Sequence, residues 1–155
     1  MKRIAHNLII RDANKRRCHM KIAIRYFTRT GNTEKLAKAV SEALNVAAET
    51  VDKPLEEKVD LLFLGSSVYA AGVDDEVKEF LGNNKDKIGT LVNFSTAALL
   101  PSTYNQVKKL AEALDFEVCD KEFHCRGSFG PLHKDRPNAQ DCQAVKAFAK
   151  SVAGI

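Results

Sequence analysis

The stretch that decides the fold reads Met20-Lys-Ile-Ala-Ile-Arg-Tyr-Phe27, followed by Thr28-Arg29-Thr30-Gly31-Asn32-Thr33. The first eight residues are an apolar-rich strand candidate, and the apolar residues after Thr33 recur at helical spacing. A helix start leaves backbone N–H groups without partners and carries partial positive charge. Gly31 allows a close approach, and the threonines offer hydroxyl groups. This turn therefore predicts a phosphate site that needs neither a metal nor a lysine.

Two better known phosphate loops differ from this turn. It lacks the Lys-Ser/Thr ending of the nucleoside-triphosphate loop and the three spaced glycines of the dinucleotide fingerprint. The difference favours a monophosphate ligand. An ordinary capped turn is the alternative, but it needs only one Ser, Thr, Asp or Asn. Three threonines around Gly31 and Asn32 exceed that need.

Length and composition indicate one cytoplasmic domain. A chain of 155 residues that is 45% hydrophobic can bury one core of ordinary size. The four cysteines show neither Cys-x-x-Cys nor zinc-ribbon spacing, so we expect reduced thiols and no metal site. They are Cys18, Cys119, Cys125 and Cys142.

The formal charge of +4 is concentrated at the N-terminus. Residues 1–19 hold six of the 24 basic side chains and one of the 20 acidic ones, so the remainder is close to neutral. This distribution argues against nucleic-acid binding. The run Leu8-Ile9-Ile10 is too short for a signal-peptide core or a membrane span. We expect a basic, flexible extension at 1–19, or less favourably a surface anchor, and one domain at 20–155.

Strand and helix candidates alternate along the rest of the chain. The stretch 59–65 is almost continuously apolar, which is typical of a parallel strand covered on both faces. Further strands are expected at 46–51, 90–95 and 117–123, and helices at 36–44, 73–81, 104–114 and 144–152, with Asn138 as the cap of the last helix.

This alternation predicts an α/β fold with a single doubly wound five-stranded parallel sheet, order 2-1-3-4-5, and helices on both faces. Parallel strands need crossover connections, and the helices provide them. In such sheets, ligands lie beyond the carboxyl ends of the strands where the order reverses. The loops after strands 1 and 3 are the unusual ones here.

Three stretches together resemble the flavodoxin family. They are the loop 28–33, the run Gly65-Ser66-Ser67-Val68-Tyr69, and Asn93-Phe94-Ser95-Thr96. The resemblance covers residues 20–152 and implies a flavodoxin-like fold with flavin mononucleotide (FMN) as cofactor. Flavodoxins hold the flavin at the switch point between strands 1 and 3.

The resemblance also implies a set of cofactor-binding residues. Tyr69 would form a wall for the flavin ring, the backbone of 70–72 would contact its N5 edge, and Arg126 could neutralise a reduced flavin or an anionic substrate, unless it is only a solvated loop charge. The implied phosphate residues are Thr28, Arg29, Thr30, Gly31, Asn32 and Thr33, and the implied ring residues are Ser67, Val68, Tyr69, Ala70, Ala71, Gly72, Ser95, Thr96 and Ala97.

The chain departs from the electron-carrying flavodoxins at the ring. It has no Trp, and the loop 97–101 lacks the tyrosine that usually covers the second ring face. Leu99 or Leu100 could replace that tyrosine, or the face could be open for a substrate. There is no strongly acidic rim for a basic reductase, since Asp74-Asp75-Glu76 could equally be a favourable first helical turn.

The loop after strand 5 carries several further candidates. Phe129 could form a lid, and His124 and His133 could donate protons. The alternatives are ordinary turn and surface roles. Cys125 could be redox-active, although an inert thiol is favoured.

Two functions follow from the resemblance, and a third stays open. The first is an FMN-binding, low-potential electron-transfer carrier, and the alternative is an FMN-dependent NAD(P)H:quinone-type oxidoreductase. The partners would be redox proteins or a small-molecule acceptor, with no nucleic acid and no membrane span. A flavodoxin fold that has lost its cofactor is the third possibility. Catalytic residues and the oligomeric state are not assigned.

Overall fold

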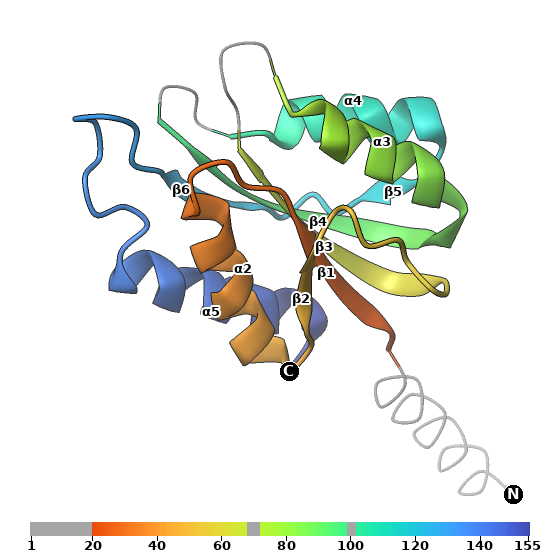
Figure 1. The fold of residues 1–155 in the computed structure, drawn as a ribbon. Helices are drawn as coiled ribbons and strands as arrows, with labels where there is room; N and C mark the ends of the chain where they lie inside the picture. The colour runs from red at the N-terminus through yellow and green to blue at the C-terminus, as the bar shows by residue number, and fades with distance from the viewer. Residues whose placement is uncertain (1–19, 68–71, 99–101) are drawn as a thin grey trace, which may run out of the picture.

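The computed structural model describes residues 20–67, 72–98 and 102–155 (Figure 1). The extension predicted at 1–19 lies outside the described residues, as do 68–71 and 99–101. The elements are β1 (Ile22–Tyr26), α2 (Asn32–Leu44), β2 (Ala48–Thr50), β3 (Val59–Ser67), α3 (Asp75–Asn84), the 3-10 helix η1 (Lys85–Lys87), β4 (Ile88–Ala97), α4 (Tyr104–Leu114), β5 (Glu117–Val118), β6 (Phe123–Arg126) and α5 (Ala139–Ala153).

The strands form one parallel sheet in the order β2-β1-β3-β4-β5, and β6 also pairs with β4. This order confirms the predicted topology. The apolar stretch at 59–65 lies at the centre as β3, where Phe63 is the register partner of Ile24 on one side and of Val92 on the other. All three side chains are fully buried.

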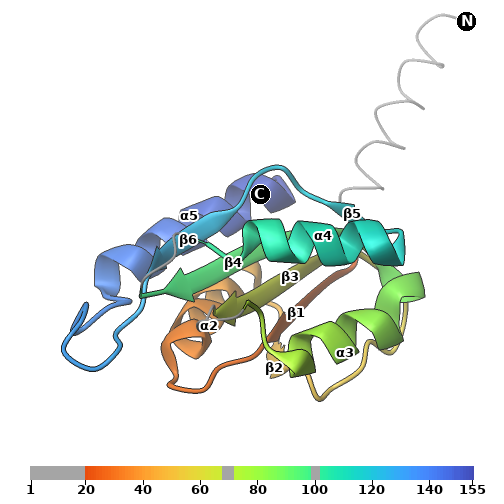
Figure 2. The ribbon, with the colours of Figure 1, turned by 90° about the horizontal axis from the view of Figure 1, so that it is seen from above.

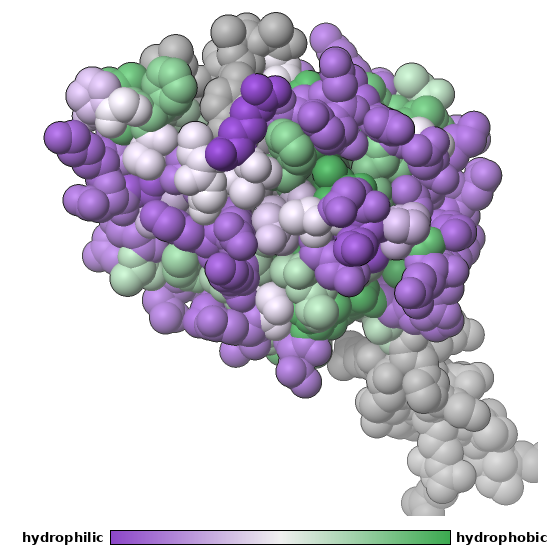
Figure 3. Space-filling view, in the orientation of Figure 1, coloured by the Kyte–Doolittle hydropathy of each residue, from purple (hydrophilic) through white to green (hydrophobic). Residues whose placement is uncertain are grey.

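Helices cover both faces of the sheet (Figures 1 and 2). α3 and α4 cover one face, where Leu62, Val77 and Val107 share a buried cluster. α2 and α5 cover the other, where Leu36 and Val145 pack in a second cluster. Figure 3 shows hydrophilic residues over most of one side of the molecule, with apolar residues in small separate patches. No helix in the described part of the chain could cross a membrane.

The fifth strand position differs from the prediction. Instead of one strand at 117–123, β5 pairs with Thr90 and Leu91, and β6 pairs with the last four residues of β4. Between them Glu122 accepts hydrogen bonds from Ser102 Oγ (2.5 Å) and Asn93 Nδ2 (3.4 Å). The strand divides because the Asn93 amide and the Ser102 hydroxyl hold the Glu122 carboxylate. The carboxyl ends of β1, β3, β4 and β6 meet at one edge, where α2 begins.

Candidate functional site

The loop between β1 and α2 leaves the helix start without a side-chain cap. Gly31, the N-cap residue, has φ 88° and ψ 0°, a left-handed conformation that favours glycine. The Gly31 N–H donates to Thr28 Oγ1 (2.9 Å), which closes the loop on itself. The first N–H groups of an α-helix have no partner within the helix. Because no side chain caps this one, the start of α2 can receive an anion.

The two sides of this loop differ in their packing. A Cβ atom built on Gly31 meets nothing within 4 Å, so the chain is open to a ligand there. On the inner side, a Cβ on Gly65 would lie 2.4 Å from the Phe94 ring and 2.9 Å from Thr33 Cγ2. Only glycine at position 65 lets the start of α2 approach β3 this closely. Arg29 and Thr30 are exposed on the outer side.

The buried half of the loop is bound to two distant segments. Thr33 Oγ1 lies 3.1 Å from Thr96 Oγ1 at the end of β4, and both residues are buried. Asn32 Nδ2 donates to the Ser128 carbonyl (2.9 Å), and Ser128 Oγ donates to Asn32 Oδ1 (3.2 Å). The structure thus brings three predicted residues together and adds Ser128, which the sequence reasoning missed. Ser128 stands in a loop that contains Gly127 and Gly130, and nothing in that local sequence indicates a contact with Asn32.

The end of β3 presents a buried polar atom. Ser67 is 7% exposed, and its Oγ has no hydrogen-bond partner among the described residues. Ser67 is also the register partner of Thr96. Gly72 has φ 112°, a conformation available mainly to glycine. Val68, Tyr69, Ala70 and Ala71 lie outside the described residues.

The last three residues of β4 are all predicted ring residues, and the first of them, Ser95, faces away from the phosphate loop. Its Oγ accepts a hydrogen bond from the Thr103 N–H (3.3 Å), and Thr103 Oγ1 accepts from Ser66 Oγ (3.0 Å) and Asn93 Nδ2 (3.0 Å). Neighbouring strand residues point to opposite faces, so Ser95 joins the α4 side while Thr96 faces α2. This network anchors the start of α4. Ala97 is buried at the end of β4.

The loop after β6 is held against the end of β4. Arg126 Nη1 donates to the Ala98 carbonyl (3.2 Å), and His133 Nε2 lies 3.1 Å from the same oxygen. Phe129 and Leu132 exchange backbone hydrogen bonds of 3.0 Å each, and their side chains are exposed. Arg126 therefore lies beside the end of β4.

The other candidates on β6 have different surroundings. His124 Nδ1 lies 3.3 Å from Glu122 Oε1, a carboxylate neighbour that the sequence did not reveal. Burial, with the nearby Asp141 carboxylate, raises the pKa of Cys125 to about 12. A thiol with this pKa stays protonated at neutral pH, which fits the inert role.

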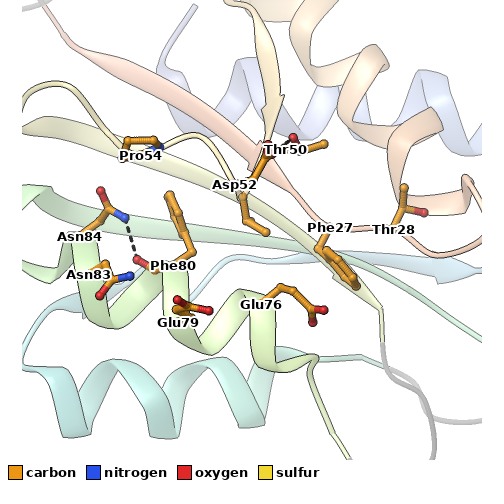
Figure 4. Close-up of a pocket in the computed structure, with 11 residues that line it drawn as sticks. Phe27, Thr28, Thr50, Asp52, Pro54, Glu76, Glu79, Phe80, Asn83 and Asn84 are labelled. Atoms are coloured by element: carbon orange, nitrogen blue, oxygen red, sulfur yellow. Dashed lines mark hydrogen bonds between the residues drawn. The ribbon is translucent and has the colours of Figure 1, made fainter.

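A pocket of about 650 Å³ lies between the segment that follows β2 and helix α3 (Figure 4). Phe27, Val51 and Phe80 supply apolar walls, and its three charged residues, Asp52, Glu76 and Glu79, are all acidic. Of the predicted cofactor residues that the structure describes, only Thr28 lines it. Acidic walls oppose a phosphate, so this pocket is not the phosphate site.

The groups at the start of α2 fit a phosphate ester. An uncapped helix start, the open side of Gly31 and the orphaned Ser67 hydroxyl offer donors and space where the carboxyl ends of β1, β3 and β4 meet. Arg29 adds a positive charge and pairs with Asp74 of the loop after β3. The sequence alone left Asp74 as part of an acidic rim or of a first helical turn, and did not indicate this ion pair. The described residues hold no group of three His, Cys, Asp or Glu suited to a metal.

Comparisons with known proteins place the chain in a family. The Flavodoxin domain model matches residues 23–132. An uncharacterized protein of Methanocaldococcus jannaschii is 31% identical, over 78% of this chain and 89% of its own length.

Among solved structures, a flavodoxin from the domain Archaea is similar with a TM-score of 0.69 at 15% identity, over 87% of this chain and 97% of that one. Flavodoxin 1 from Bacillus cereus gives 0.67 at 15%, over 86% and 97%. Rubredoxin oxygen:oxidoreductase from Desulfovibrio gigas gives 0.67 at 13%, over 86% of this chain and 35% of that protein. These structures support the fold, and the family model and the M. jannaschii relative show that the chain belongs to the flavodoxin family, which implies a flavin cofactor.

Proposed function

We propose that the protein binds FMN and carries electrons at low potential between partner proteins in the cytoplasm. The observation that carries this proposal is the uncapped, left-handed start of α2 at Gly31, joined to β4 through Thr33 and Thr96. A flavin bound there would supply one- and two-electron transfer. Cys119, Cys125 and Cys142 are free thiols, which supports a reducing compartment.

The phosphate would be held by donors of two kinds. The N–H groups of the first turn of α2 point toward an anion at the helix start. The hydroxyls of Thr28, Thr30 and Thr33 would donate to its oxygens. Hydrogen bonds to a charged acceptor contribute about 1.5–3 kcal/mol each, so a few such contacts suffice for retention. Asn32 has a supporting role, because Ser128 already engages both ends of its amide.

The ring would lie beyond the carboxyl ends of β3 and β4. The backbone near Gly72 would face its N5 edge, and Ser67 and Ala97 would line the floor. Arg126, held at the Ala98 carbonyl, would offset negative charge on a reduced flavin. Tyr69 remains the proposed aromatic wall.

A second candidate is an FMN-dependent NAD(P)H:quinone-type oxidoreductase. Phe129 and Leu132 favour it, because they are 53% and 41% exposed on a turn whose neighbouring His133 contacts Ala98. Apolar side chains beside an uncovered ring face could contact a quinone. A small-molecule acceptor would then replace the partner protein.

One experiment tests the cofactor and separates the two functions. The purified protein, incubated with FMN and freed of excess, should show a flavin spectrum in the visible range. A carrier should accept electrons under anaerobic photoreduction and oxidise NADH or NADPH only slowly, whereas steady turnover of either nicotinamide with a quinone would establish the enzyme. A colourless protein after incubation with FMN would contradict both functions.

A further inference from the structure

The phosphate loop and the loop after β3 are tied together by an ion pair. Arg29 Nε donates to Asp74 Oδ1 (2.9 Å), and Arg29 Nη2 contacts the same oxygen. The partners are 45 residues apart in sequence. Arg29 lies between the two phosphate-loop threonines Thr28 and Thr30, and Asp74 lies two residues after Gly72. The pair therefore joins the two segments proposed to hold opposite ends of the flavin.

The two partners differ in their access to water. The side chain of Asp74 is 6% exposed and that of Arg29 is 59% exposed. A buried carboxylate is costly without a partner, and Asp74 Oδ2 has none among the described residues. The carboxylate thus depends on Arg29. An exposed arginine can sample many conformations, so this contact also restrains the outer half of the phosphate loop.

The position of Asp74 strengthens this interpretation. Asp74 is the N-cap residue of α3, and its carbonyl accepts from the N–H groups of Val77 and Lys78. Aspartate at an N-cap normally accepts a hydrogen bond through its side chain as well. Here the side chain makes no cap hydrogen bond and turns to Arg29 instead. The Asp74 side chain therefore pairs with Arg29 of the phosphate loop instead of capping α3.

We propose that Arg29 and Asp74 are positioning residues that fix the segment 72–74 relative to the phosphate loop. This inference rests on the proposed function. With the pair intact, the backbone that faces the N5 edge of the flavin stays at one separation from the phosphate anchor. Without it, the segment 72–74 loosens, the flavin leaves faster, and the hydrogen bonding that sets its reduction potentials changes.

The test uses four variants and a matched control, and one of the four, Arg29→Lys, keeps the charge. Arg29→Gln and Asp74→Asn each remove one charge, the double variant removes both, and asparagine retains the ability to cap α3. Lys146→Gln breaks another ion pair, the 2.7 Å contact of Lys146 Nζ with Glu42 Oε2 that joins α2 and α5 away from the loops. FMN and riboflavin dissociation are followed by the recovery of flavin fluorescence.

We expect each single variant that removes a charge to speed dissociation of FMN and riboflavin about tenfold, because removing one partner of a hydrogen-bonded charge pair acts mainly on the dissociation rate. The double variant should be no faster than the single ones, because both act through one contact. The spacing of the two one-electron potentials of the flavin should shift in all three variants that remove a charge. Dissociation from Arg29→Lys should be less than about threefold faster than from the wild type, because lysine keeps the charge. Dissociation from Lys146→Gln should match the wild type.

Three results would overturn the proposal. Faster release of FMN but not riboflavin, in Arg29 variants alone, would make Arg29 a direct phosphate ligand. Unchanged flavin release together with faster hydrogen exchange at 73–76 in the cofactor-free variants would make the pair merely structural. If the wild type binds neither flavin, the proposed function itself fails. Because that last result needs no variant, the two failures are distinguishable.

Discussion

Helices α2 and α5 pack side by side on the same face of the sheet, yet their first turns are built differently (Figure 1). The start of α5 is fully capped. Asn138 Oδ1 accepts from the Asp141 N–H (3.0 Å), and Asp141 Oδ2 accepts from the Asn138 N–H (2.8 Å). Arg136 adds two hydrogen bonds to the same carboxylate, of 2.6 and 2.8 Å. This confirms the predicted cap at Asn138.

The start of α2 has no such arrangement. Its N-cap residue is Gly31, which has no side chain to donate or accept. A side-chain cap contributes about 1 kcal/mol to stability, so the chain forgoes that amount at α2 and keeps it at α5. What sets the start of α2 apart is that it combines a missing side-chain cap with a left-handed glycine and open space around it, so that an external anion can take the place of the cap. The predictions below test this division of roles.

The largest expected effect comes from Thr30→Val combined with Thr33→Val. Losing two hydroxyl donors to a charged phosphate should weaken FMN binding about 100-fold, or ~3 kcal/mol. Fluorescence titration measures this affinity. Riboflavin, which lacks the phosphate, should bind both proteins equally, and an unchanged FMN affinity would refute the phosphate assignment.

A smaller effect is expected from Gly31→Ala, with Gly130→Ala as its matched control. Both glycines have positive φ, 88° and 56°, and open space around the Cβ position. Each substitution should cost about 1–2 kcal/mol in thermal unfolding because alanine resists this conformation. Only Gly31→Ala should also weaken FMN binding, about tenfold, because the strained loop turns its N–H groups away. Equal losses of FMN affinity in the two variants would contradict the proposed role of Gly31 at the phosphate site.

The smallest effect on flavin is expected at the closed helix start. Asp141→Asn should lower the free energy of unfolding by about 1–2 kcal/mol at pH 7 and change FMN affinity less than about twofold. Burial opposes ionisation, yet hydrogen bonds from Arg136 and the Asn138 N–H lower the pKa of Asp141 overall. Its contribution is therefore present above the unfolded pKa of about 3.9 and is lost as pH falls through the lower folded value. Thermal unfolding at several pH values should show the wild type and Asp141→Asn converging in acid; a constant difference would contradict this.

The sequence was sufficient for the features that depend on local pattern. The apolar run at 59–65 predicts the central strand, and residues 28–33 predict a turn from a strand into a helix. Features that depend on residues far apart in the sequence could not be predicted from it. Glu122 divides the last strand because of Asn93 and Ser102, and nothing local to 117–123 shows this.

The same limit applies to the site. Thr33 and Thr96 were both predicted, but the hydrogen bond between them spans 63 residues. The contacts of Asn32 with Ser128 and of Arg29 with Asp74 span 96 and 45 residues. Each joins polar residues that any surface loop could carry, so only the fold reveals them.

We propose above that the uncapped start of α2 binds a phosphate ester. Calorimetric titration of the flavin-free protein with FMN and with riboflavin tests it most directly. The account predicts that FMN binds at least about 100-fold more tightly, since the two ligands differ only in the group that this site receives. Equal affinities for the two, or no heat with either, would contradict it.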